Sequence, residues 1–241
     1  MDRESYVIGV LGGMGTYATL HLFRQYAAVF PAEKEWERPR ILIDNRCTMP
    51  SRVRAALYGE NREQLIREMT DSVRNLIQSG ASRILLACNT AHLFLPDICA
   101  RFPEAEGKIL NLIEVCADAL SEKEVKEVFL LASEGTIDSG IWQEACRARG
   151  IRCETPATEE YQILRNCIEA VKRNEYTEDV CIAFGEFLHR NTACVLGCTE
   201  LPVLYEKYQD LCTGTEVYDP VFITLTEMRK EYEKGFDFRR V

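Results

Sequence analysis

Two stretches of this 241-residue chain decide its fold: Ile84-Leu85-Leu86-Ala87-Cys88-Asn89-Thr90 and Ala193-Cys194-Val195-Leu196-Gly197-Cys198-Thr199. Each is a short apolar run, typical of a buried strand, that ends in a cysteine followed by a small polar residue. Buried core cysteines are common, but these two lie where a strand stops. Because α/β proteins bind ligands at the carboxyl ends of their strands, Cys88 and Cys198 are candidate functional residues.

The same two sections begin alike. Val7–Leu11 leads into the glycine turn Gly12–Gly15, and Val128–Ala132 leads into Ser133–Thr136, at similar distances before the two cysteines. This repetition indicates a duplicated unit. Two such lobes joined face to face would place the cysteines on opposite sides of one cleft.

The whole chain alternates β-rich runs with amphipathic stretches, which predicts an α/β fold of two similar Rossmann-like lobes with parallel sheets. The clearest helix is 60–79, ended by Gly80. We expect 1–115 to form the first lobe, completed by 214–241, and 116–213 to form the second. The expected strands are Tyr6–Leu11, Arg40–Asp44, Arg83–Ala87, Lys108–Asn111, Glu127–Ala132, Ile151–Glu154, Ala193–Gly197 and Glu216–Tyr218.

Composition limits the possible partners. The formal charge of −9 argues against nucleic acid, whose binding normally needs a basic face. The first apolar stretch ends too early, at Gly12-Gly13, for a signal sequence, and no apolar run approaches the roughly 18 residues of a membrane span. We therefore expect a cytoplasmic protein with no membrane partner.

Eleven cysteines are many, but their number is odd and their spacing irregular, which argues against a disulfide framework. The chain has no Cys-x-x-Cys pair and three histidines, so we expect no metal site. The remaining cysteines are interpreted as packing or incidental residues: Cys47, Cys99, Cys116, Cys146, Cys153, Cys167, Cys181, Cys194 and Cys212.

Two opposed thiols suit one kind of chemistry. Inverting the α-carbon of an amino acid needs a base on one face and an acid on the other, and a thiolate and a thiol can fill these roles. Asn89 and Thr199 are expected to open helices after Cys88 and Cys198. The helix N-termini would then lower the pKa of each cysteine below its usual value of about 8.5.

Five stretches, in order along most of the chain, resemble the aspartate/glutamate racemase superfamily, and within it the aspartate racemase branch. They are Gly12–Gly15, Asp44–Arg52, Ala87–His92, Glu134–Gly140 and Leu196–Pro202. The resemblance implies a two-thiol racemase that works without pyridoxal phosphate, metal or nucleotide, in a cleft between two α/β lobes. It also implies a small amino-acid substrate and a homodimer.

The resemblance assigns roles to individual residues. Cys88 and Cys198 would be the catalytic acid/base pair. An arginine and a lysine would hold the side-chain carboxylate, and Arg52 and Lys172 fit these positions, with Arg173 as the alternative to Lys172. The residues expected around the α-amino and α-carboxylate groups are Met14, Asn89, Thr90 and Thr199.

Departures from the family pattern bear on the substrate. Ala87 and Ser51 stand where proline and aspartate are frequent, and neither change removes a group that the reaction needs. Glu200 stands where glutamate racemases have histidine, which favours aspartate, with glutamate as an additional substrate. Glu200 is either a favourable charge at the start of a helix or a catalytic group. His92 is expected to make structural hydrogen bonds.

Two other readings stay open. A non-catalytic amino-acid sensor would use the same binding residues. A maleate isomerase or a single-cysteine decarboxylase shares the fold, although the two cysteines argue against the decarboxylase. Arg52 and the Thr199-Glu200 pair favour an amino-acid substrate over a maleate isomerase.

Overall fold

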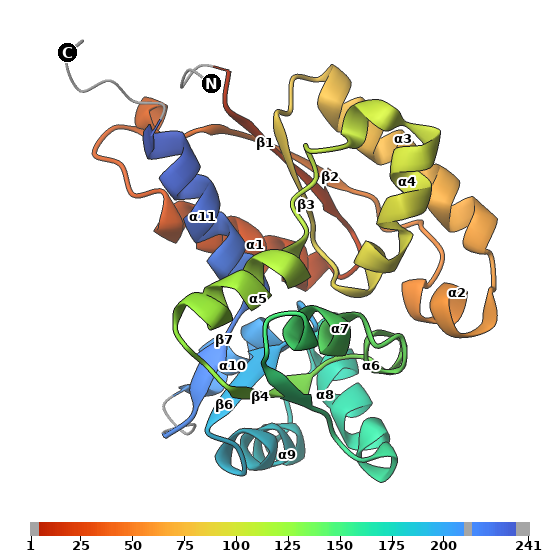
Figure 1. The fold of residues 1–241 in the computed structure, drawn as a ribbon, viewed down its shortest axis with the longest axis vertical. Helices are drawn as coiled ribbons and strands as arrows, with labels where there is room; N and C mark the ends of the chain where they lie inside the picture. Colours follow the sequence, from red (N-terminus) through yellow and green to blue (C-terminus); the bar gives the residue numbers. More distant parts are fainter. Residues whose placement is uncertain (1–4, 210–213, 235–241) are drawn as a thin grey trace.

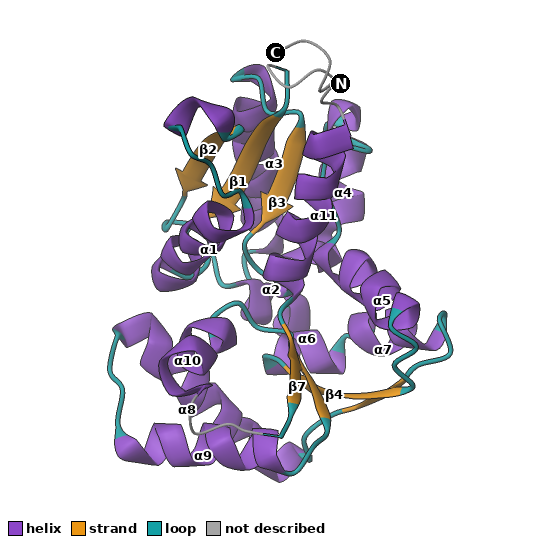
Figure 2. Cartoon of the chain, turned by 90° about the vertical axis from the view of Figure 1, so that its left-hand side faces the viewer, coloured by secondary structure: helices purple, strands orange, loops and turns teal. Residues whose placement is uncertain are grey.

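The computed structural model describes residues 5–209 and 214–234, and these form two α/β bodies stacked end to end (Figure 1). The first body contains a parallel sheet in the order β2-β1-β3. Its strands are β1 (Val7–Gly12), β2 (Arg40–Asn45) and β3 (Arg83–Leu86). In Figure 2 their arrowheads point toward the second body, so their carboxyl ends face it.

The second body repeats this plan. Its parallel sheet has the order β5-β4-β6-β7, and β5, β4 and β6 correspond in order to β2, β1 and β3. The matching strand order agrees with the duplication that the sequence predicts. The strands are β4 (Glu127–Leu131), β5 (Arg152–Glu154), β6 (Ala193–Leu196) and β7 (Glu216–Tyr218).

Helices cover both faces of each sheet. Those of the first body are α1 (Thr16–Val29), α2 (Arg52–Tyr58), α3 (Arg62–Gln78), α4 (Leu95–Arg101) and α11 (Pro220–Lys234), with the 3₁₀ segment η2 (Thr90–Phe94). Those that pack around the second sheet are α5 (Leu112–Glu122), α6 (Glu134–Asp138), α7 (Ile141–Arg147), α8 (Tyr161–Arg173), α9 (Glu178–His189) and α10 (Leu201–Tyr208).

The alternation of side-chain direction along the strands explains why the first body has a hydrophobic core on each face of its sheet. Ile84 and Leu86 pack with α3 on one face, whereas Leu85 between them packs with α1 and α11 on the other. Successive side chains of a strand point to opposite faces, so an uninterrupted apolar strand needs a helical cover on both sides. The second sheet follows the same rule, with α5 and α7 on one face and α8, α9 and α10 on the other.

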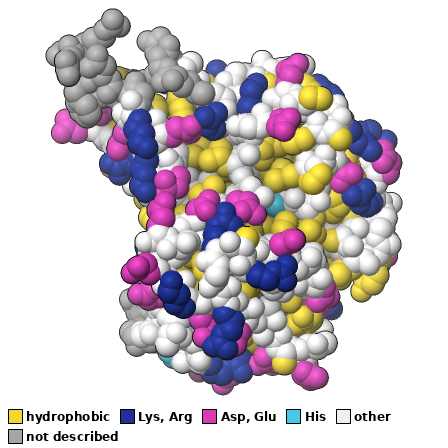
Figure 3. Space-filling view, viewed as in Figure 1, with side chains coloured by type: hydrophobic (Ala, Val, Ile, Leu, Met, Phe, Trp, Pro, Cys, Tyr) yellow, Lys and Arg dark blue, Asp and Glu magenta, His cyan; other side chains and the backbone are white. Residues whose placement is uncertain are grey.

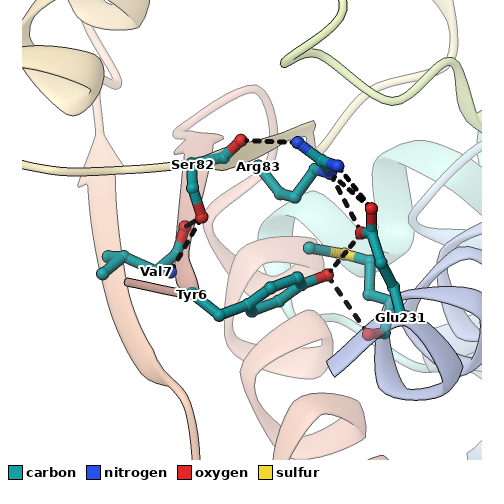
Figure 4. A network of polar contacts seen from close by, with 6 residues as sticks. Tyr6, Val7, Ser82, Arg83 and Glu231 are labelled. Atoms are coloured by element: carbon teal, nitrogen blue, oxygen red, sulfur yellow. Dashed lines mark hydrogen bonds and ion pairs between the residues drawn. The ribbon is translucent and has the colours of Figure 1, made fainter. Parts of the chain in front are cut away.

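A polar network fixes α11 to the first sheet (Figure 4). Glu231 accepts hydrogen bonds from Arg83 Nε at 2.9 Å and from the Tyr6 hydroxyl at 2.9 Å. Ser82 Oγ accepts the backbone N–H of Val7 at 3.0 Å. Helix α11 is thereby tied to β1 and to the start of β3.

Two expectations about this architecture need correction. Residues 108–111 make only an isolated bridge between Ile109 and Ile84, because Asn111 already caps α5 by accepting the N–H of Ile113 at 3.1 Å. The segment 214–234 is divided: α11 packs on the first body, but β7 pairs with β6 in the second sheet. The rest of the predicted domain division stays a prediction.

The surface is mixed in charge. On the face in Figure 3, acidic and basic side chains are interspersed, and no broad basic area is visible there. Within the described ranges, no helix is both long enough and apolar enough to cross a bilayer.

Candidate active site

The carboxyl ends of the strands in the two bodies meet and are joined by buried hydrogen bonds. The Thr199 hydroxyl, after β6, donates to the carbonyl of Ala87, after β3, at 3.2 Å. The Thr90 hydroxyl lies 2.7 Å from that of Thr136 and 3.1 Å from that of Ser133, both just beyond β4. The residue before Cys88 is therefore bonded to the residue after Cys198.

Cys88 is half-buried and follows β3 after one residue. The chain then enters η2, whose first turn is closed by the Ala91 N–H on the Cys88 carbonyl at 3.2 Å. The expected helix after this cysteine is thus a short 3₁₀ segment, with Asn89 at its cap position. Within the described residues, no side chain hydrogen bonds to the Cys88 sulfur.

Cys198 differs from the sequence-based expectation of a thiol with a lowered pKa. Cys198 is half-buried, and its sulfur donates to Glu200 Oε2 at 2.9 Å. Burial, and then the charge and hydrogen bond of Glu200, raise the pKa of Cys198 well above its usual value. Lys172 opposes this rise and the charge of Cys88 adds to it, so the two cysteines lie within electrostatic reach.

Glu200 reaches between the two bodies. It is 3% exposed and lies at the cap position of α10, with Oε1 unpaired among the described residues. A Cβ built on Gly15 would lie 2.2 Å from this Oε1, so only a glycine leaves room for the carboxylate beside the first turn. The charge at the helix start, expected from the sequence, is therefore also the partner of Cys198.

His92 is a structural residue by its contacts. Its Nε2 accepts the backbone N–H of Leu112 at 3.2 Å, so the proton sits on Nδ1, which lies 3.0 Å from the Cys88 carbonyl and 3.2 Å from that of Asn89. Burial lowers the pKa of His92 to about 4. The neutral ring fixes the backbone at Cys88.

Asn89 has an unusual side chain for a buried position. It is 2% exposed, and neither its amide nitrogen nor its amide oxygen has a partner in the described structure. Buried polar groups are nearly always hydrogen-bonded, so a free donor and acceptor beside Cys88 suit an absent polar ligand.

Arg52, expected as a carboxylate clamp, begins α2 and points its guanidinium at the first-body loops. It donates to the Met14 carbonyl at 2.7 Å and to the Pro50 carbonyl at 3.1 Å, while its buried Nε has no partner among the described residues. Met14, 3% exposed, packs its side chain into the first-body core. Arg52 therefore couples the Met14 turn to α2, and its Nε remains available to a ligand.

Lys172 lies on α8 with its side chain 38% exposed and forms an ion pair with Glu169 at 2.8 Å. Burial lowers its pKa, but the charges of Glu200, Glu169 and Cys198 outweigh this effect and raise it. Lys172 lines a cavity of about 400 Å³ between α2 and α8, and Ser133 lines the same cavity. Arg173, the alternative, instead pairs with Glu175.

Ser133 and Thr136 were missed as site residues by the sequence analysis. Their hydroxyls join that of Thr90 in one buried cluster, and Thr136 is fully buried. The available signal was the glycine turn after β4, which repeats the turn after β1. A larger cavity, about 690 Å³, lies between α1, α5, α10 and α11 and contains neither Cys88 nor Cys198.

Comparison with known proteins identifies the family. A profile of the Asp/Glu/hydantoin racemase family matches residues 11–228, which include both cysteine motifs. The chain belongs to this family. This Asp/Glu/hydantoin racemase family member is 26% identical to a glutamate racemase of Aquifex aeolicus over 166 residues, which cover 67% of this chain and 63% of that relative. The match thus spans less than two thirds of the relative's length.

Solved structures give a fuller match. An aspartate racemase of Picrophilus torridus superposes with a TM-score of 0.81 at 27% identity, covering 95% of this chain and 94% of that one. An aspartate racemase homologue of Pyrococcus horikoshii gives 0.72 at 20% identity over 94% and 98% of the two chains, which is a likeness of fold alone. The family and the α/β fold predicted from the sequence are therefore confirmed.

Proposed function

We propose that this member of the racemase family interconverts L- and D-aspartate, with glutamate as an additional substrate, by a two-thiol mechanism that needs no cofactor. The observation that carries the proposal is the junction of the two cysteine motifs, where Thr199 bonds the carbonyl of Ala87. Two thiols from separate strand ends at one site match a reaction that needs proton transfer on both faces of a carbon.

The proposed reaction has two proton transfers. One cysteine, as thiolate, takes the α-proton and becomes a thiol, which leaves the electron pair on the α-carbon conjugated with its carboxylate. The thiol of the other cysteine then donates its proton to the opposite face and becomes a thiolate. The configuration inverts, and the net charge of the site is unchanged.

The polar residues supply the binding groups in this proposal. The unpaired amide of Asn89 would contact the α-amino or α-carboxylate group. Arg52, through its free Nε, and Lys172, through its ammonium group, would hold the side-chain carboxylate. Met14, Thr90 and Thr199 would act by fixing the walls of the site, since the hydroxyls of both threonines are already hydrogen-bonded.

We propose further that the enzyme works in the cytoplasm as a homodimer. Gel filtration with light scattering checks the dimer, and an elution mass of one chain would contradict it.

Proton NMR in D₂O tests the function. Protein dialysed exhaustively against a chelator is incubated with L-aspartate, and loss of the α-proton signal is expected together with formation of D-aspartate. Activity that returns only with pyridoxal phosphate or a divalent metal would contradict cofactor independence. Binding of aspartate with no exchange and no inversion would instead favour an amino-acid sensor, and conversion of maleate to fumarate without any action on aspartate would favour a maleate isomerase.

A further inference from the structure

The contact between Cys198 and Glu200 makes the two thiols of the site unequal. The Cys198 sulfur lies 2.9 Å from Glu200 Oε2, and Glu200 is 3% exposed. The Cys198 thiol is the donor in this contact, and the Glu200 carboxylate oxygen is the acceptor. A thiolate at the same position would face a buried negative group with no hydrogen between them.

The other charges around Cys198 are too few to reverse this preference. Lys172 from α8 is the cation that faces it, and Glu169 already pairs with that ammonium group at 2.8 Å. Cys88, from the first body, adds negative charge when it ionises. Burial and Glu200 accordingly raise the pKa of Cys198 despite Lys172.

Cys88 has different surroundings. No side chain among the described residues hydrogen bonds to its sulfur, and Cys88 itself is half-buried. His92, which touches the Cys88 carbonyl, is neutral at physiological pH, because burial lowers its pKa to about 4.

We propose that Glu200 is a positioning residue that holds Cys198 as the thiol in the resting enzyme, so that Cys88 is the base that begins each reaction. This inference rests on the proposed function. The resting enzyme is then ready for one enantiomer only. After turnover Cys88 holds the substrate proton and Cys198 is a thiolate; Cys198 regains a proton from water as Cys88 releases one, which restores the resting form.

Alkylation by iodoacetamide across a range of pH, with no substrate present, tests the inference on the full chain. Trypsin releases Cys88 in peptide 84–101 and Cys198 in peptide 191–207, and fragmentation distinguishes them from Cys99 and Cys194. The pH of half-maximal rate reports ionisation independently of access to the sulfur, because each curve is scaled to its own plateau. Cys198 should reach half-maximum at a higher pH than Cys88.

Three variants sharpen the test. Glu200→Gln keeps the shape and removes the charge, so alkylation of Cys198 at pH 7 should rise about tenfold or more, as expected for a pKa that falls by one unit or more. Lys172→Met should move the half-maximum of Cys198 to higher pH. Glu206→Gln, a half-exposed carboxylate on α10 that pairs with His21, is the matched control and should leave both curves in place.

The outcomes separate this inference from the proposed function. If Cys198 ionises at or below the pH of Cys88, or if Glu200→Gln leaves its curve unmoved, the inference is wrong whether or not the protein racemises aspartate. If the curves behave as expected but no α-proton exchange occurs, the inequality of the thiols stands and the proposed function fails. If the Glu200 variant does not fold, the alkylation curves of Cys88 and Cys198 in the wild-type protein alone test the inference.

Discussion

Arg52 and Arg54 stand two residues apart on α2 and should behave very differently. Arg52 bonds two backbone carbonyls of the first body, at 2.7 and 3.1 Å, whereas Arg54 lies at the surface in an ion pair with Glu60 at 2.6 Å. In the proposed site Arg52 also holds the side-chain carboxylate. A charge-assisted pair in an enclosed site contributes more than a surface pair.

We therefore expect Arg52→Leu to lower kcat/KM for aspartate on the order of a hundredfold, which corresponds to a few kcal/mol. Arg54→Leu should change it less than about twofold. Steady-state kinetics and circular dichroism on both variants check this. Equal losses would show that Arg52 has no special role in the site.

His92 gives a stability prediction whose sign follows from its pKa. The folded value of about 4 lies below the ordinary value of 6.5, so between these values the unfolded chain binds a proton that the folded chain does not. The contribution of His92 is complete above pH 6.5 and is lost as the pH falls toward 4. A shift of this size corresponds to about 3 kcal/mol.

Denaturant unfolding from pH 7 to pH 4 measures this loss. The wild type and His189→Gln, a change at an exposed histidine on α9, should share the steep decline, and His92→Gln should start less stable and decline less. A parallel decline of the His92 variant would mean that other groups cause the acid sensitivity.

At the scale of elements, the approach of α6 to α2 positions the hydroxyl cluster that contacts Thr90. A Cβ built on Gly135 would lie 3.2 Å from the Cα of Val53, a backbone atom that moves only with α2. Gly185, in the middle of α9, has open space around it. These two glycines allow one substitution to be compared in crowded and open surroundings.

Gly135→Ala should destabilise the fold by about 1–3 kcal/mol, as overpacking does, and should also lower kcat. Gly185→Ala should stabilise it by about 0.5–1 kcal/mol, because alanine has less backbone conformational entropy than glycine in the unfolded chain and therefore loses less on folding. Denaturation midpoints and turnover rates check both. A Gly135→Ala variant with unchanged stability and kcat would show that α2 and α6 can move apart without affecting the fold or the site.

The elements were also the scale at which the sequence was most informative, and where its limits are clearest. The apolar run 84–87 and the periodic helix 60–79 have strong local signals, and β3 and α3 were predicted within a few residues. The strand predicted at residues 108–111 was wrong because capping of α5 by Asn111 competes with strand pairing. Strand β7 was assigned to the wrong body because pairing with β6 is a long-range choice that no local pattern records.

Some residues of the candidate site could likewise be predicted from the sequence, and others could not. Cys88 and Cys198 could be named because each ends an apolar strand in a repeated pattern. The raised pKa of Cys198 was not predictable, since it depends on burial of the thiol and on which way Glu200 turns. Ser133 and Thr136 were not predictable as neighbours of Thr90, because their contacts exist only once the two bodies meet.

At the scale of the whole molecule, the repeated plan of the two bodies accounts for a proposed site that lies between them. Each sheet presents its strand ends, and thus one cysteine motif, to the other, so in the proposed reaction each body supplies one of the two proton-transfer groups. The central claim is therefore that Cys88 and Cys198 share one reaction. It requires that each cysteine be needed for inversion but not for exchange on its own face.

The most direct measurement is α-proton exchange in D₂O for Cys88→Ala and Cys198→Ala, each with L- and with D-aspartate. We predict that neither variant racemises, because acid–base assistance worth about 10²–10⁴-fold is lost on one face. Each should exchange the α-proton of one enantiomer, and the two variants should act on opposite enantiomers, with Cys88→Ala the slower at neutral pH because Glu200 favours the thiol form of Cys198. Near-normal racemisation by either variant, or exchange of the same enantiomer by both, would contradict the account.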